Sequence, residues 1–149
     1  MSTNSASTNG SGSTLGWLAD GVSSVATGIS SNGWIVGYAE YSDAPHRHAF
    51  LASIFGGMQD LGPLATDYMA ADISARKRIV GTIFPEFRSG AENLAWTWKD
   101  GTFGYLPTPQ SLGSVAEAVN TCGTVVGHTW DPNAQVSRAV RWIRRACDP

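Results

Sequence analysis

The sequence repeats itself three times. The same nine-residue pattern runs from Ile29 to Gly37, from Ile73 to Gly81 and from Val119 to Gly127, and the copies begin 44 and 46 residues apart. Each copy opens with Ile or Val and closes with Gly eight positions later. A period in this range indicates one supersecondary unit copied in series, each unit burying its apolar face against the next. The fold must therefore follow from how the copies stack.

Each copy predicts β-strands, because apolar residues alternate, β-branched residues are frequent and no long 3.6-residue period appears. In the first copy, residues 24–30 and 34–41 are predicted strands. Asn32-Gly33 between them supplies the positive φ angles of a two-residue hairpin turn. Cys122-Gly123 marks the same turn in the third copy. The second copy has Arg76-Lys77 there, so we expect its turn to be built differently.

Third and fourth strands complete the unit. Third strands are predicted at 48–51, 94–98 and 138–142, and fourth strands at 57–62 and 101–106. The third copy lacks a fourth strand, whereas residues 15–18 resemble residues 61–64. We therefore expect the N-terminal strand to complete the last unit, because such a swap closes a ring and removes exposed sheet edges.

Three motifs of the first copy point to a known family. They are Ile-Ser-x-x-Gly-x-Ile-Val-Gly, His48-Ala49-Phe50-Leu51 and Asp60-Leu61-Gly62-Pro63-Leu64. Together they resemble the HAF-type extracellular repeat, over roughly residues 15–143. The resemblance implies a propeller-like arrangement of β repeats and an extracellular or periplasmic location, without an assigned activity. The His-Ala-Phe motif is Leu94-Ala95-Trp96 and Arg138-Ala139-Val140 in the other copies.

The predicted architecture is all-β, with three repeats of about 45 residues that each form a four-stranded antiparallel blade. Propellers usually hold four to eight blades. We therefore favour a homodimer that forms a six-bladed β-propeller around a two-fold axis, with a monomeric β-trefoil-like domain as the alternative. Residues 1–14 read as a flexible Ser/Thr/Asn/Gly-rich linker, and 15–149 as one domain. Its repeats span about 19–64, 65–109, and 110–149 plus 15–18.

Composition and net charge limit the classes of partner that the chain is expected to bind. The 149 residues are 42% hydrophobic and 15% charged, which suits one globular domain. Ten basic against twelve acidic side chains give a net charge of −2, so we expect neither nucleic acid nor a membrane as partner. The sequence contains no apolar run of about 18 residues and no recognisable signal peptide.

Carboxylates near the loops that follow the second strands are the catalytic candidates. Glu40, Glu86 and Asp131 occupy comparable places in the three units, and ring symmetry would gather them on one rim. Glu117 is the fourth candidate, in a predicted strand of otherwise small or apolar residues. A carboxylate pair is what glycoside cleavage requires, although most loop carboxylates are only solvated. His128 is a further candidate, because it follows Val-Val-Gly where the other copies have Tyr38 and Thr82.

Aromatic and basic residues are the ligand-binding candidates. An indole that stacks on a sugar face is the usual way in which a β-scaffold holds carbohydrate, which singles out Trp34 and Trp130. His46, Arg47 and His48 form the densest polar cluster. No third metal ligand lies near these histidines in the sequence, so we predict no metal and no cofactor. The basic clusters around residues 76–78 and 141–145 are interpreted as solvated charge.

The two cysteines, Cys122 and Cys147, are predicted to form a disulfide if the protein is exported, tying down the end of the third unit. Taken together, the sequence favours a propeller-like binding or scaffold module for a small polar ligand such as a saccharide. The alternatives are a small hydrolase of glycosidic or ester bonds at the same rim, and a structural repeat fragment of a larger surface protein.

Overall fold

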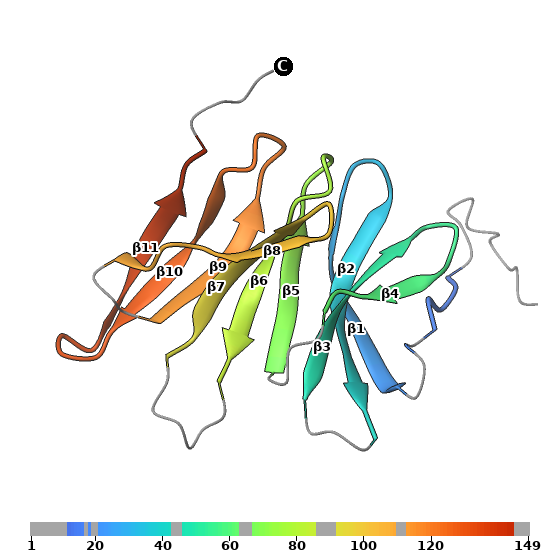
Figure 1. Ribbon diagram of the computed structural model, residues 1–149, viewed down its shortest axis with the longest axis horizontal. Coiled ribbons are helices and arrows are strands. Elements are labelled where there is room, and N and C mark those ends of the chain that lie inside the picture. Colours follow the sequence, from blue (N-terminus) through green and yellow to red (C-terminus); the bar gives the residue numbers. More distant parts are fainter. Residues whose placement is uncertain are drawn as a thin grey trace, which may run out of the picture.

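The fold was analysed in a computed structural model that describes residues 12–16, 18, 21–42, 46–62, 67–85, 92–109 and 113–144. These residues form eleven strands in three antiparallel sheets, without an α-helix in the described ranges (Figure 1). The predicted all-β class with one sheet per repeat is confirmed. Figure 1 shows the sheets standing in a row, with the second between the first and the third.

Within each sheet the strands pair in chain order. The first sheet holds β1 (Gly21–Ile29), β2 (Trp34–Tyr41), β3 (Arg47–Ser53) and β4 (Met58–Asp60). The second holds β5 (Asp67–Ile73), β6 (Ile79–Phe84), β7 (Leu94–Lys99) and β8 (Thr102–Tyr105). The third holds β9 (Gly113–Val119), β10 (Val125–Asp131) and β11 (Val136–Trp142). The first two units therefore have four strands and the third has three.

The glycine that closes each repeat motif lies opposite a β-bulge in the first strand of its sheet. At each bulge one residue of the first strand has no partner in the register of the second strand: Thr27, Ala71 and Glu117. A Cβ atom on Gly37, Gly81 or Gly127 would lie only 1.9 to 2.0 Å from a backbone carbonyl oxygen of the bulged strand. Because no side chain fits there, the repeat needs glycine at this position.

The turn between the first two strands is the same in all three units. The amide groups of Gly33, Lys77 and Gly123 donate to the carbonyl oxygens three residues earlier, at 2.9 to 3.0 Å. Lys77 adopts a φ of 57°, in the left-handed region that the two glycines also occupy. The prediction that the second turn is built differently is therefore wrong. The Lys77 amine lies 3.4 Å from the centre of the Trp34 ring, and this cation–π contact offsets part of the backbone strain.

Apolar side chains fill both interfaces of the middle sheet. Val36 of the first sheet packs against Tyr68, Ala70 and Ile73 of the second, and Val80 of the second packs in one cluster with Ala116 and Val119 of the third. The first and third sheets thus each cover one face of the second (Figure 1). This serial stacking differs from a trefoil, in which the units surround a threefold axis, so the monomeric trefoil alternative is wrong.

The N-terminal segment lies on the first sheet. Ser24 Oγ donates to the Gly16 carbonyl oxygen at 2.8 Å, the Gly21 amide donates to Leu18 O at 2.9 Å, and the buried Leu18 side chain packs against Phe50. The third sheet consists of β11, β10 and β9. The prediction that this segment completes the third unit is therefore wrong within a single chain, because Leu18 is buried against the first sheet.

Candidate functional site

An ion pair lies at the rim of the apolar interface between the first and second sheets. Arg47 on β3 contacts Asp67 on β5, with Nη2 2.6 Å from Oδ2 and Nε 3.2 Å from Oδ1. Burial alone would raise the pKa of Asp67, but the hydrogen bonds and charge of Arg47 lower it below its ordinary value. The same pair raises the pKa of Arg47, which also lies over the Tyr38 ring. The two side chains of this ion pair join the first and second sheets at the rim of their interface.

The equivalent place between the second and third sheets is open. The strand registers place Asn93 where the first interface has Arg47, and Gly113 where it has Asp67. Here the Ser114 amide donates to the Asn93 carbonyl oxygen at 2.8 Å. A cavity of about 260 Å³ replaces the ion pair. We call it the rim cavity, and it is lined by Glu92, Asn93, Gly113, Val115, His128 and Trp130.

Two predicted residues, His128 and Trp130, come together in the rim cavity. Both lie on β10 two positions apart, so the alternation of the strand points them to the same face. Trp130 is 47% exposed, which is unusual for an indole within a strand. His128 Nδ1 lies 3.4 Å from Glu117 Oε1. Because Glu117 is the bulged residue of β9, the bulge aims its carboxylate at the neighbouring strand.

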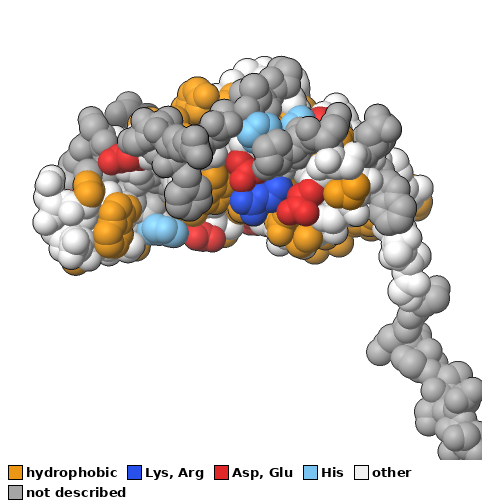
Figure 2. Space-filling model, turned by 90° about the horizontal axis from the view of Figure 1, so that it is seen from below, with side chains coloured by type: hydrophobic (Ala, Val, Ile, Leu, Met, Phe, Trp, Pro, Cys, Tyr) orange, Lys and Arg blue, Asp and Glu red, His pale blue; other side chains and the backbone are white. Residues whose placement is uncertain are grey.

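A second, longer hollow runs beside the rim cavity along the first strands of the three units. It has a volume of about 450 Å³ and is lined by Thr27, Met69, Ala70, Ala71, Thr82, Phe84, Val115, Ala116 and Glu117. All three bulge residues therefore border it. Val115 lines both hollows, and Glu117 borders one while it contacts His128 of the other. In Figure 2, which views this side from below, a histidine adjoins an acidic side chain beside apolar groups.

Two of the predicted carboxylates have structural partners. Asp131 accepts hydrogen bonds from the amides of Asn133 and Ala134 and forms a 3.1 Å ion pair with Arg138. These interactions lower the pKa of Asp131, the backbone hydrogen bond from Ala134 being the main cause. Glu40 accepts a hydrogen bond from Ser23 Oγ at 3.0 Å. Glu86 lies outside the described residues. Glu40 lies on β2 of the first sheet and Asp131 on β10 of the third, and the proposed pairing of these carboxylates stays a prediction.

The other predicted ligand-binding residues lie away from the rim cavity. His48 Nδ1 is 2.9 Å from Asp60 Oδ2, and its ring contacts those of Tyr41 and Tyr68. His46 immediately precedes β3, and its charge helps to lower the pKa of Asp67. Trp34 lies at the start of β2 beneath the Lys77 amine. Cys122 lies in the turn before β10, whereas Cys147 lies outside the described residues, so the disulfide stays a prediction.

Sequence reasoning missed Glu92, Asn93 and Gly113 as cavity residues. The sequence contained a signal for the cavity. When the three repeats are aligned, Gly113 occupies the position of Asp67 and Asn93 occupies the position of Arg47. Loss of both partners of one ion pair predicts either repacking or an opening. Among the described residues there is no group of three or more side chains suited to hold a metal ion. Nor does this part of the chain contain a helix long and apolar enough to cross a membrane.

The chain was compared with family models, with curated proteins and with solved structures. None of the three comparisons gave a match. The function must therefore be argued from the site itself.

Proposed function

We propose that this protein is a binding module that holds a saccharide in the rim cavity. The observation that carries the proposal is the difference between two otherwise equivalent sheet interfaces. Arg47 and Asp67 fill the first one, whereas Asn93 and Gly113 leave the second one open next to an exposed tryptophan. Apolar stacking interfaces normally close, so an opening lined by an indole and polar groups suits a ligand.

The chemistry of the rim cavity favours a sugar. Trp130 offers an apolar face for the C–H face of a sugar ring, while Asn93, His128 and Glu92 offer donors and acceptors for its hydroxyl groups. The volume of about 260 Å³ lies just below the roughly 300–1,000 Å³ of ordinary ligand pockets. We therefore expect one terminal sugar unit, with the rest of a longer glycan outside the cavity.

The test refills the cavity with the pair found at the first interface. In the double variant Asn93→Arg/Gly113→Asp, we expect saccharide-dependent quenching of tryptophan fluorescence to weaken at least tenfold, while the circular dichroism spectrum stays unchanged. Trp130→Ala should remove the quenching. Trp34→Phe, at the other end of the sheets, is the matched control and should leave binding unchanged. A panel of neutral mono- and disaccharides that binds wild type and the refilled variant equally would contradict the proposal.

The Glu117–His128 pair favours a second candidate function, hydrolysis of glycosidic or ester bonds. Glu117 Oε1 lies 3.4 Å from His128 Nδ1, and a carboxylate that accepts a hydrogen bond from a histidine ring supports general base catalysis by that ring. Release of chromophore from nitrophenyl glycosides and esters would show this activity. Turnover that is lost in His128→Ala but kept in Asp131→Asn would favour the hydrolase, whereas saturable quenching without turnover would favour the binding module. A chain that does neither would be a structural repeat.

We further propose that two chains close a six-bladed, propeller-like ring. Ile73 and Val119 are 3% and 8% exposed where they face the preceding sheet, whereas the equivalent Ile29 is 64% exposed. Val36 and Val80 are fully buried against the following sheet, whereas the equivalent Val126 is 47% exposed. The open face of the first sheet therefore carries an exposed apolar residue at the position that is buried in the other two sheets, and so does the open face of the third sheet. Placing the third sheet of one chain on the first sheet of another would repeat the internal contacts.

The N-terminal segment supports this closure. Ser24 donates to the carbonyl oxygen of Gly16 as the equivalent Tyr68 donates to that of Gly62, two residues after the end of β4. The segment thus lies on the first sheet as the end of a preceding fourth strand would. In the ring, that preceding sheet is the three-stranded third sheet of the partner. Membership of the HAF-type repeat family and an extracellular or periplasmic location are part of the same proposal and rest on the sequence resemblance.

A further inference from the structure

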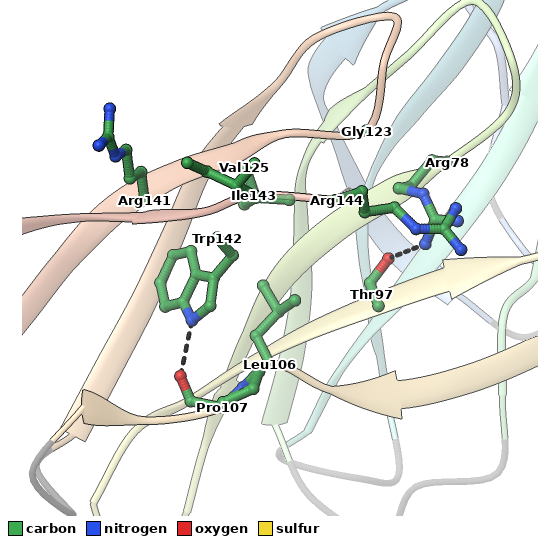
Figure 3. Close-up of a pocket in the computed structure, with 10 residues that line it drawn as sticks. All are labelled: Arg78, Thr97, Leu106, Pro107, Gly123, Val125, Arg141, Trp142, Ile143 and Arg144. Carbon is green, nitrogen blue, oxygen red and sulfur yellow. Dashed lines mark hydrogen bonds between the residues drawn. The ribbon is translucent and has the colours of Figure 1, made fainter. Parts of the chain in front are cut away.

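A separate cavity lies at the opposite end of the second and third sheets from the rim cavity. It has a volume of about 420 Å³ and is lined by residues of both sheets: Arg78, Thr97, Leu106, Pro107, Gly123, Val125, Arg141, Trp142, Ile143 and Arg144 (Figure 3). We call it the arginine cavity. None of these residues takes part in the saccharide site proposed above.

Two guanidinium groups converge at one end of the arginine cavity. Arg78 comes from the segment before β6 and Arg144 from the segment after β11, yet Figure 3 shows their side chains side by side. Both cross the same turn. A Cβ atom on Gly123 would lie 3.1 Å from Arg78 Nε and 3.3 Å from Arg144 Cδ. The glycine therefore leaves the space in which the two arginines meet.

The charge of this pair is not balanced by a carboxylate contact among the described residues. Arg78 Nη1 donates to a neutral acceptor, Thr97 Oγ1, at 3.1 Å. Burial lowers the pKa of Arg78, and the neighbouring charge of Arg144 lowers it further, while the more distant Asp100 acts in the opposite direction. Asp100 itself lies 3.5 Å from Lys99. Arg78 is partly buried and Arg144 is exposed. Two guanidinium groups this close repel each other, and an anion that binds between them removes the repulsion.

The remaining wall of the cavity is apolar. Leu106, Val125 and Ile143 lie between the arginines and Trp142. Trp142 Nε1 donates to the Pro107 carbonyl oxygen at 2.6 Å, which fixes the indole across the two sheets. The side chain of Arg141, by contrast, extends away from the other two arginines in Figure 3. The cavity thus combines a cationic end with an apolar body.

We propose that the arginine cavity binds the oxyanion group of a small organic ligand, with Arg78 and Arg144 as its recognition residues. A guanidinium fork matches the oxygens of a phosphate, sulfate or carboxylate group, and two forks from different sheets would hold it from two sides. The Trp142 wall would contact the body of the ligand. Bound anion would also stabilise the contact between the second and third sheets, because it links residues of both.

The test measures calorimetric binding and thermal unfolding with inorganic phosphate at constant ionic strength. We expect phosphate to bind and to raise the melting temperature relative to chloride. Arg78→Gln and Arg144→Gln should each weaken binding about tenfold or more, the loss expected for a hydrogen bond between charged groups. Arg138→Gln is the matched control, because it removes one positive charge from the same strand outside the cavity, where Arg138 pairs with Asp131, and it should bind phosphate like wild type. If Arg78→Gln does not fold, the comparison of Arg144→Gln with Arg138→Gln decides alone.

Three further probes identify the source of the oxyanion. A sugar phosphate, a hexuronate and a sulfated monosaccharide are titrated against wild type, and tighter binding than inorganic phosphate identifies the class that also uses the Trp142 wall. Wild type that binds none of the four anions, or variants that all bind phosphate equally, would overturn the proposal. Because Trp130→Ala leaves the arginine cavity intact, failure of the saccharide site and failure of this site are seen separately.

Discussion

At the residue scale, Asp67 carries the contact between the first and second sheets. It accepts hydrogen bonds from the side chain and the backbone amide of Arg47, and these hold its pKa below the ordinary value against the opposing effect of burial. A carboxyl group with a lower pKa in the folded state stabilises the fold above the unfolded pKa of about 3.9, and this contribution is lost as the pH falls through the folded pKa.

We therefore predict a pH-dependent effect of Asp67→Asn. At pH 7 the variant should lose about 1–3 kcal/mol of the free energy of unfolding in urea, because Arg47 keeps its charge without its partner. The difference from wild type should shrink as the pH is lowered from about 5 to 3, since wild type then loses the same interaction. Glu40→Gln, on the exposed rim, is the control and should change stability by less than about 0.5 kcal/mol. A difference that does not vary with pH would contradict this account.

At the element scale, the bulge and its glycine define each unit. The Cβ of an alanine at position 81 would lie 2.0 Å from the Met69 carbonyl oxygen and 2.6 Å from the Trp96 ring. Neither the strand nor the buried indole can move far, because both belong to the packed interface with the first sheet. The bulge therefore cannot form around any residue larger than glycine.

We predict that Gly81→Ala destabilises the protein by more than about 3 kcal/mol, as expected when backbone must shift in a packed core. Gly104→Ala is the matched control, because a Cβ there meets nothing within 4 Å. It should cost less than about 1 kcal/mol. Thermal unfolding of the two variants followed by circular dichroism makes the comparison, and equal melting temperatures would refute the role assigned to the bulge.

The strands and two of the turns could be predicted from sequence because their signals are local. Alternating apolar residues and Asn32-Gly33 indicate a hairpin without knowledge of the rest of the chain. The turn at Lys77 could not, because its left-handed residue also contacts Trp34 of another unit. The change from His48 in the first unit to Leu94 in the second is explained only by a contact between strands. His48 pairs with Asp60, and the second unit has Tyr105 at the position of Asp60.

The rim cavity could be predicted only in part, for the same reason. His128 and Trp130 stand out in the sequence, but the opening beside them depends on Asn93 and Gly113, which differ from Arg47 and Asp67 at distant positions. The arginine cavity was missed because its two recognition residues lie 66 positions apart and meet only across the turn at Gly123. Contacts between units, rather than within them, are what the sequence alone left open.

At the scale of the whole molecule, three stacked sheets expose two unlike faces. The open face of the first sheet exposes Ile29, whereas the equivalent Ile73 and Val119 are buried in the other two sheets. The open face of the third sheet exposes Val126, whereas the equivalent Val36 and Val80 are buried. In the ring that we propose, the two kinds of face would form a head-to-tail contact between chains, and two such contacts around a two-fold axis would leave no open face. Without that closure, both faces would stay exposed to water and prone to further association.

The mass of the protein in solution tests this closure most directly. Light scattering across the eluting peak, at concentrations from low to high micromolar, should give twice the mass of one chain. Ile29→Glu should halve it by placing a charge at the contact, while Tyr105→Glu, on the outer strand of the middle sheet, should leave it doubled. Wild-type protein that stays at the mass of a single chain over the whole range would contradict the ring.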